Sequence, residues 1–176
     1  MDTKIMFPES RISRFLFSDT RMAWFWLLLR VYVGWVWLAA GWEKINNPAW
    51  VGDGAGTAVS GFLNGALAKT TGAHPNVSQW YAWLINSFAL DNATIFSYVV
   101  AYGEVAVGLG LIVGLLSGIA AFFGALMNFN FLFAGTVSIN PLLILIEIFL
   151  ILAWRTVGWW GLDRWFLRLL RRRPVM

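Results

Sequence analysis

The sequence predicts an all-α fold: an integral membrane four-helix bundle with a long extracytoplasmic loop between helices 1 and 2 that carries short interfacial helices. Three observations lead to this fold class. Hydrophobic residues make up 59% of the chain and charged residues 12%. In soluble domains, hydrophobic residues make up about 45–50% and charged residues about 25%. Four apolar segments come close to the ~20 residues that a helix needs to cross a bilayer. Lysine and arginine are concentrated before the first segment and after the last.

The four predicted membrane-spanning helices run over residues 22–41, 95–115, 118–137 and 140–160. The very short link Leu116–Gly118 forces the second and third helices into an antiparallel hairpin. Pro141 is well placed in the first turn of the fourth helix. Residues 22–160 are therefore expected to form one membrane domain, preceded by an N-terminal segment over 1–21 and followed by a basic tail over 161–176.

The connection between the first and second helices is long for so small a protein. It opens with a glycine-rich stretch at Val51–Gly56, which is typical of a loop. Helical periodicity follows over residues 58–69 and 78–89, but neither piece is long enough to cross a bilayer. Both are predicted to be interfacial helices over the outer mouth of the bundle. They either fill gaps between the helices or form a lid over a pocket.

The basic residues predict the orientation of the chain. Those near or beyond the ends of the apolar segments on the terminal sides are Lys4, Arg11, Arg14, Arg21, Arg155, Arg164, Arg168 and Arg171–Arg173. The long connection contains only Lys44 and Lys69. Because cytoplasmic segments carry the excess of lysine and arginine, both termini are expected to be cytoplasmic in a multi-pass protein of the cell membrane. The same cations predict attraction to anionic membrane lipid and no binding of nucleic acid.

Ionisable and amide side chains inside the apolar segments carry the functional signal. Four of them, taken one from each predicted span, are Arg30, Glu104, Asn128 and Glu147. An unpaired charge at the centre of a membrane helix costs at least ~2.5–3.5 kcal/mol. Each of these residues lies on a stripe of small residues, which predicts that they meet inside the bundle. Trp37 and Lys44 share the stripe of the first helix at helical spacing.

These groups allow two interpretations. In the first, Arg30 pairs with Glu104 or Glu147 and holds the bundle together. In the second, they line a polar pocket that is reached from the outer face or laterally from lipid. Two acids against one deep base leave a surplus carboxyl group that would exchange a proton when buried, chemistry that suits a site beside a quinone. Asn128 would then hydrogen-bond a quinone carbonyl, whereas His74 is expected to be an ordinary loop residue.

The composition also limits the cofactors. The sequence contains no cysteine and a single histidine, which excludes disulfides, iron–sulfur clusters, bis-histidine haem and a histidine-rich metal site within one chain. No metal site is therefore predicted, and quinone is the only expected cofactor, as electron acceptor.

Several of these residues resemble the DoxX family. The likeness is carried by Arg30-Val-Tyr-Val-Gly34, by Gly41-Trp-Glu-Lys44, by Tyr102-Gly103-Glu104 with Gly108, and by Gly161-Leu-Asp163-Arg164. It covers roughly residues 22–166. The long outer loop that follows Lys44 resembles the DoxD type within that family.

The resemblance implies the large membrane subunit of a thiosulfate:quinone oxidoreductase, which works with a small DoxA subunit. Such an enzyme oxidises thiosulfate to tetrathionate and passes the electrons to membrane quinone. The predicted catalytic residues are Arg30, Lys44, Glu104 and Glu147. The predicted quinone-binding residues are Arg30, Trp37, Glu104, Asn128 and Glu147. Lys44, beside Lys69 or His74, would supply cations for the thiosulfate dianion.

Two other functions remain open from the sequence. One is a non-catalytic membrane scaffold that recruits redox enzymes. The other is a small-solute or proton-coupled carrier, although the sequence shows neither the internal repeat nor the broken helices common in transporters. Assembly as a homo-oligomer would provide a carrier with more helices.

Overall fold

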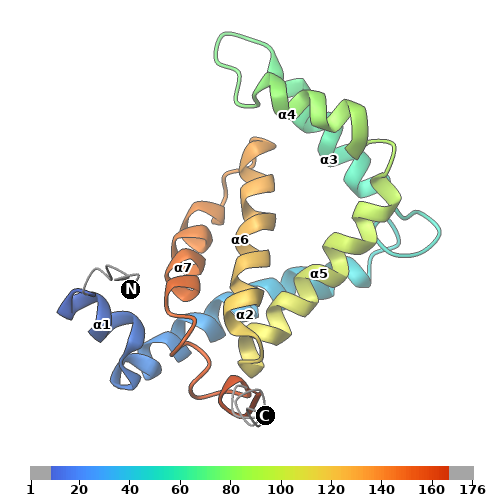
Figure 1. Cartoon of the computed structure of the whole chain (residues 1–176). Helices are drawn as coiled ribbons and strands as arrows, with labels where there is room; N and C mark the ends of the chain where they lie inside the picture. The colour runs from blue at the N-terminus through green and yellow to red at the C-terminus, as the bar shows by residue number, and fades with distance from the viewer. Residues whose placement is uncertain (1–8, 167–176) are drawn as a thin grey trace, which may run out of the picture.

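The computed structural model describes residues 9–166, in which helices connected by loops and turns are the only regular secondary structure and no strand is present (Figure 1). The helices are α1 (Arg11–Ser18), α2 (Ala23–Ile45), α3 (Thr57–Leu67), α4 (Gln79–Leu84), α5 (Ala93–Val113), α6 (Ser117–Phe133) and α7 (Asn140–Leu152). A short 3₁₀-helical turn, η1 (Thr20–Met22), precedes α2, and another, η2 (Ala68–Thr70), follows α3. A π-helical turn, η3 (Ile85–Ala89), continues α4. The all-α class is confirmed for these residues.

Within residues 9–166, two helices are long and apolar enough to cross a membrane, namely the continuous helix over Thr20–Ile45 and α5. The helices α6 and α7 are shorter, with 17 and 13 residues, or about 26 and 20 Å at 1.5 Å per residue. The helix predicted over 140–160 thus ends early, at Leu152. Beyond it the chain continues in turns, and the amides of Leu162 and Asp163 donate to the carbonyls of Val113 and Gly114.

The long helices run in alternating directions, and α2 packs closely on α5. Glycines make this approach possible, because a Cβ on Gly108 would lie 2.7 Å from the Cα of Leu38, and one on Gly41 would lie 2.7 Å from the amide nitrogen of Val105. Figure 1 shows α5 and α6 leaving their tight turn close together and diverging toward their other ends. Gly114 in that turn has a φ of 71°, a conformation that favours glycine.

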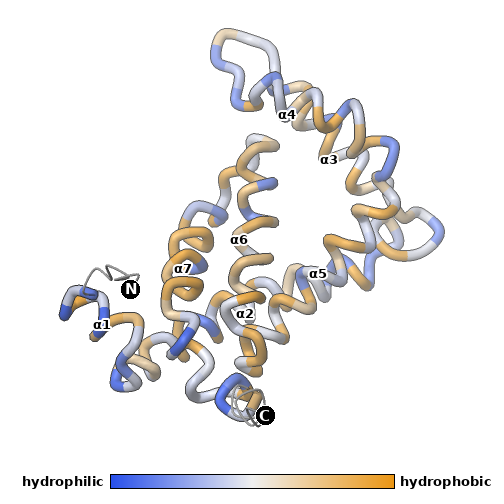
Figure 2. Tube along the Cα trace, viewed as in Figure 1, coloured by the Kyte–Doolittle hydropathy of each residue, from blue (hydrophilic) through white to orange (hydrophobic). Residues whose placement is uncertain are grey.

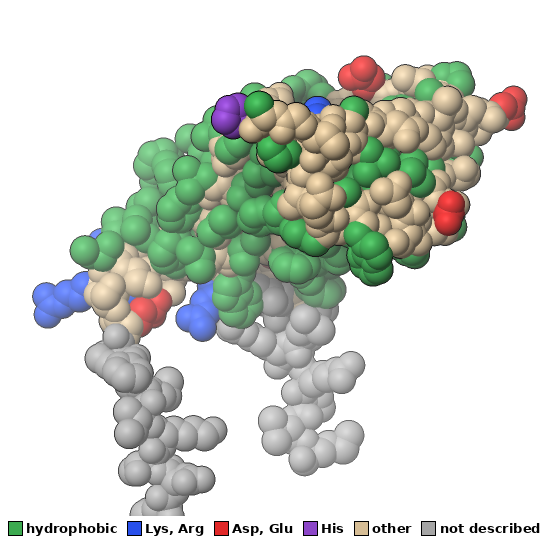
Figure 3. All heavy atoms as spheres, turned by 90° about the horizontal axis from the view of Figure 1, so that it is seen from above, with side chains coloured by type: hydrophobic (Ala, Val, Ile, Leu, Met, Phe, Trp, Pro, Cys, Tyr) green, Lys and Arg blue, Asp and Glu red, His purple; other side chains and the backbone are tan. Residues whose placement is uncertain are grey.

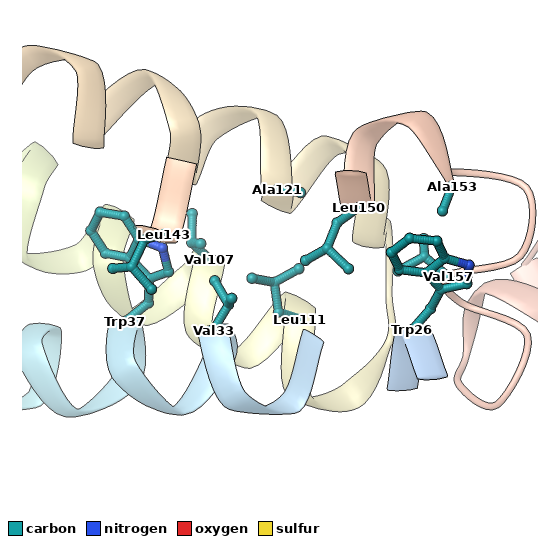
Figure 4. Packing of buried hydrophobic residues seen from close by; sticks show 10 residues of the cluster. All are labelled: Trp26, Val33, Trp37, Val107, Leu111, Ala121, Leu143, Leu150, Ala153 and Val157. Carbon is teal, nitrogen blue, oxygen red and sulfur yellow. The ribbon is translucent and has the colours of Figure 1, made fainter. Parts of the chain in front are cut away.

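The main core lies between α2, α5, α6 and α7. Figure 4 shows its side chains in a row between these helices: Trp26, Val33, Trp37, Val107, Leu111, Ala121, Leu143, Leu150, Ala153 and Val157. Figure 2 shows that the same helices are apolar along most of their length. Large side chains there, such as Leu28, Trp35, Val99, Phe122 and Leu145, are more than half exposed. Such surfaces fit a hydrocarbon environment better than water.

The connection between α2 and α5 forms a helical layer over one end of the bundle. The predicted helices over 58–69 and 78–89 are confirmed as α3 with η2 and α4 with η3. Lys69 Nζ donates to the carbonyl of Gly135 at 3.0 Å, and the Tyr81 hydroxyl donates to the carbonyl of Asn130 at 3.1 Å. These contacts attach the layer to the C-terminal end of α6. Figure 3 looks onto this end and shows hydrophobic side chains spread over much of the visible surface.

A short helix that the sequence analysis did not foresee, α1, lies at the opposite end. Trp26 Nε1 donates to the carbonyl of Leu16 at 2.8 Å, and Thr156 Oγ1 donates to the carbonyl of Phe17 at 3.2 Å. The Phe17 ring also stacks on Phe149 of α7. The end of α1 is thus packed against the bundle and does not form a free terminal segment.

Candidate functional site

A cavity of about 660 Å³ lies between the long helices and beneath the layer of α3 and α4. Its volume falls within the range of about 300–1,000 Å³ typical of small-molecule sites. Most of its wall is aliphatic or aromatic. The side chains with polar atoms among its lining residues are Trp37, Lys44, Trp50, Tyr81, Glu104, Asn128, Asn130, Thr136, Ser138 and Asn140. Four of the predicted site residues, Trp37, Lys44, Glu104 and Asn128, therefore share one cavity.

Lys44 and Glu104 form an ion pair at the cavity wall. Lys44 Nζ lies 2.7 Å from Glu104 Oε2, where the lysine side chain is 20% exposed and the glutamate 1%. Lys44 Nζ also lies 5.2 Å from the centroid of the Trp50 ring. Ser97 Oγ donates to the carbonyl of Trp50 at 2.6 Å and helps to position that residue. A desolvated carboxylate needs such a partner, because an unpaired buried charge is strongly unfavourable.

Glu147 is satisfied differently, by two uncharged donors. Trp37 Nε1 donates to Glu147 Oε1 at 2.6 Å, and Asn128 Nδ2 donates to Glu147 Oε2 at 2.8 Å. Glu147 is fully buried behind these two residues. A Cβ on Gly124 would lie only 2.6 Å from Glu147 Oε1, so glycine leaves room for the carboxylate. Hydrogen bonds to an ionised acceptor are stronger than those between neutral groups.

Arg30 lies outside the cavity, and the expected pairing with Glu104 or Glu147 is wrong within the described residues. Its Nη1 donates to the carbonyls of Leu111 and Ile112, and its Nη2 donates to the carbonyl of Trp160 at 3.0 Å. The last carbonyls of a helix have no partner within it and carry a partial negative charge, so they attract a cation. Arg30 therefore caps α5.

Asp163, which the sequence analysis quoted only as part of the family likeness, lies at the same end of the bundle. Its carboxylate accepts hydrogen bonds from the amides of Leu116 and Ser117, at the start of α6. It also attracts Arg30 electrostatically. The motif Gly161–Arg164 thus has a structural role in this fold, joining the ends of α5 and α6.

Other expected contacts are replaced. Lys69 binds the carbonyl of Gly135, and His74 is exposed in the outer loop. Neither lines the cavity, so the structure does not bring them to Lys44 as a cation cluster. Within residues 9–166, no group of three or more histidine, cysteine, aspartate or glutamate side chains is arranged to hold a metal ion.

Tyr81 and Trp50 were missed by the sequence analysis. Burial raises the pKa of the Tyr81 hydroxyl, which therefore stays protonated and donates to Asn130. Tyr81 lies within the helix predicted over 78–89, but periodicity alone did not show that it faces a cavity. Trp50 belongs to the loop before α3, where no periodic pattern indicates orientation.

The family model described as DoxX matches residues 25–137, well over half of the chain. The chain belongs to the DoxX family. The match includes every polar cavity residue from Trp37 to Thr136 but ends before Glu147 and the motif Gly161–Arg164. No match was found among curated proteins or among solved structures. Membership in DoxX and the long apolar helices together indicate a membrane protein.

Proposed function

We propose that this DoxX protein crosses the membrane four times and binds a quinone in the cavity, as the membrane subunit of a quinone-linked oxidoreductase. Alternating helix directions (Figure 1) and the many exposed apolar side chains of these helices support four crossings. Turns after Leu152 extend the short α7 toward the end where α1 packs. The basic residues at that end support a cytoplasmic position for both termini.

One observation carries the quinone proposal: an apolar cavity in which a few polar groups converge. Lys44 is the cationic donor at the wall, suited to a quinone carbonyl oxygen. Trp37, Trp50 and Phe131 are aromatic lining residues, suited to packing against a flat ring. Sites for small organic ligands have this composition, with polar groups that orient the ligand and apolar walls that desolvate it.

The Lys44–Glu104 pair is proposed to handle protons. Reduction of a quinone to the quinol consumes two electrons and two protons. Lys44 is partly exposed and joined to the buried Glu104 by a 2.7 Å contact. The pair thus connects the cavity to the outer side, and general acid–base groups need this kind of short contact.

The electron donor is proposed from the family resemblance alone. Two thiosulfate dianions would form a sulfur–sulfur bond as tetrathionate and release the two electrons that the quinone accepts. Since the sequence has no cysteine, we propose that a DoxA-type partner subunit takes part in the transfer. Activity of the reconstituted pair with thiosulfate, read as quinol formation by ultraviolet absorption, tests this donor.

Quinone binding is tested in lipid nanodiscs by quenching of tryptophan fluorescence with a short-chain quinone, since Trp37 and Trp50 line the cavity. The variant Lys44→Met with Glu104→Leu removes both charges together, so that no buried charge is left unpaired. Loss of a hydrogen bond from a charged donor, about 1.5–3 kcal/mol, predicts a Kd that is about tenfold or more higher.

The matched control is Tyr102→Phe on α5, which lies on an exposed face and outside the cavity. It should leave the Kd unchanged. Absence of quenching in the wild-type protein, or equal Kd values for the wild-type protein and the double variant, would reject the proposed function.

A further inference from the structure

A second cavity, of about 650 Å³, lies between α5 and α6 on the outer surface of the bundle. It is lined only by apolar side chains and glycine among the described residues. Val99, Leu126 and Met127 line both this groove and the first cavity. The groove and the polar cavity therefore meet at these three residues.

The groove follows the divergence of α5 and α6 from their common turn (Figure 1). Along α5 it extends from Val99 to Val113, about 21 Å at 1.5 Å per residue. Gly103, Ala106 and Gly110 are small lining residues of the α5 wall. A Cβ on Gly103 would meet only Met127 Sδ within 4 Å, at 3.6 Å. The α5 wall is therefore recessed, with space for a hydrocarbon chain.

The adjacent residue, Asn128, has an unused acceptor. Its side chain is 1% exposed, and its Oδ1 has no hydrogen-bond partner in the described part of the chain. Its Nδ2 is already bonded to Glu147. Because Glu147 uses the amide nitrogen, the oxygen remains for a ligand in the cavity that Asn128 lines. A buried acceptor without a partner is unfavourable, so a ligand with an O–H group would bind well there.

We propose that the ligand enters sideways from the bilayer between α5 and α6 and is a long-chain hydroquinone. Its hydroxyl group donates to Asn128 Oδ1, and its hydrocarbon chain lies in the groove. This inference rests on the proposed quinone function and adds the route, the chain and the reduced form of the ligand. The groove differs from an ordinary lipid-facing surface because one end reaches the wall of a polar cavity.

The chain site is tested by the variants Gly103→Phe and Ala106→Leu, which fill the groove. Ile95→Phe is the matched control, an exposed position on α5 that lines neither cavity. Binding is measured in nanodiscs for a prenylated hydroquinone and for the same head group without the chain. We expect the groove variants to weaken binding of the prenylated compound tenfold or more and to change binding of the short compound less than twofold.

Equal effects on both compounds, or no effect on either, would overturn the chain site. The acceptor role of Asn128 is tested with the dimethyl ether of the short hydroquinone, in which both hydroxyl groups are methylated and no O–H donor remains. We expect at least tenfold weaker binding of the ether, and equal affinity would overturn the role of Asn128. Failure of the wild-type protein to bind any of these compounds would reject the proposed function itself, an outcome separate from failure of the groove variants.

Discussion

The two buried carboxyl groups differ in their hydrogen-bond partners. Glu104 has the ammonium group of Lys44 at 2.7 Å, whereas Glu147 relies on the N–H groups of Trp37 and Asn128. An ammonium partner balances the charge, while neutral donors only solvate it. Glu147 is therefore the carboxylate whose side-chain replacement tests the polar network most directly.

We predict that Glu147→Leu destabilises the protein more than Glu147→Gln. Leucine leaves two buried donors unpaired, at about 1–3 kcal/mol each. Glutamine accepts from Trp37 through its oxygen, and its amide donates to the free Oδ1 of Asn128 after that side chain rotates. Thermal unfolding in detergent, followed by tryptophan fluorescence, measures the difference. Ile148→Leu, at a partly exposed neighbouring position, is the control, and equal melting temperatures for the two Glu147 variants would contradict the network.

At the scale of helices, close packing and end capping hold the elements together. The α2–α5 contact depends on glycine at Gly34, Gly41 and Gly108, where an added Cβ would come within 3 Å of the facing helix. Arg30 caps the end of α5, and Asp163 caps the start of α6. Helices can approach this closely only where side chains are small, and van der Waals packing then replaces the hydrophobic effect, which lipid does not supply.

Gly108→Ala and Gly61→Ala are predicted to have opposite effects on stability. A Cβ at Gly108 would meet the backbone of Leu38 at 2.7 Å, and such overpacking costs about 1–3 kcal/mol. Gly61 in α3 has nothing within 4 Å of an added Cβ, so alanine should stabilise that helix by roughly 0.5–1 kcal/mol. The unfolding temperature of each variant, compared with that of the wild-type protein, shows whether the substitution stabilises or destabilises. An unchanged unfolding temperature for Gly108→Ala would contradict the close contact between α2 and α5.

The whole molecule has two distinct ends. The layer of α3 and α4 covers one end, while α1 and the segment after Leu152 lie at the other (Figure 1). Arg21, Arg155 and Arg164 belong to the second end. This distribution of charge gives the proposed orientation, with the cavity and its covering layer on the outer side.

The orientation can be measured with single cysteines, because the sequence contains none. Ser10 and His74 are both exposed, one just before α1 and the other in the outer loop. We expect a membrane-impermeant maleimide to label His74→Cys in intact cells and to label Ser10→Cys only after the membrane is permeabilised. Labelling of Ser10→Cys in intact cells would contradict cytoplasmic termini.

Local pattern was enough to predict much of the fold. The helices, the two outer helical pieces and the buried positions of Arg30, Glu104, Asn128 and Glu147 follow from hydrophobic periodicity, which depends only on neighbouring residues. The early end of α7 did not follow, because the turns after Leu152 depend on contacts with the distant Val113 and Gly114.

The partners of the buried charges were decided only by tertiary structure. A stripe of residues shows which face of a helix is buried, but not the depth at which two helices meet. The packing of Gly41 beside Val105, and of Gly34 beside the Gly108 carbonyl, sets that register for α2 and α5. It places Arg30 at the end of α5 and Lys44 beside Glu104. The sequence therefore determined that polar groups are buried, and the register of the helices decided which of them form the cavity.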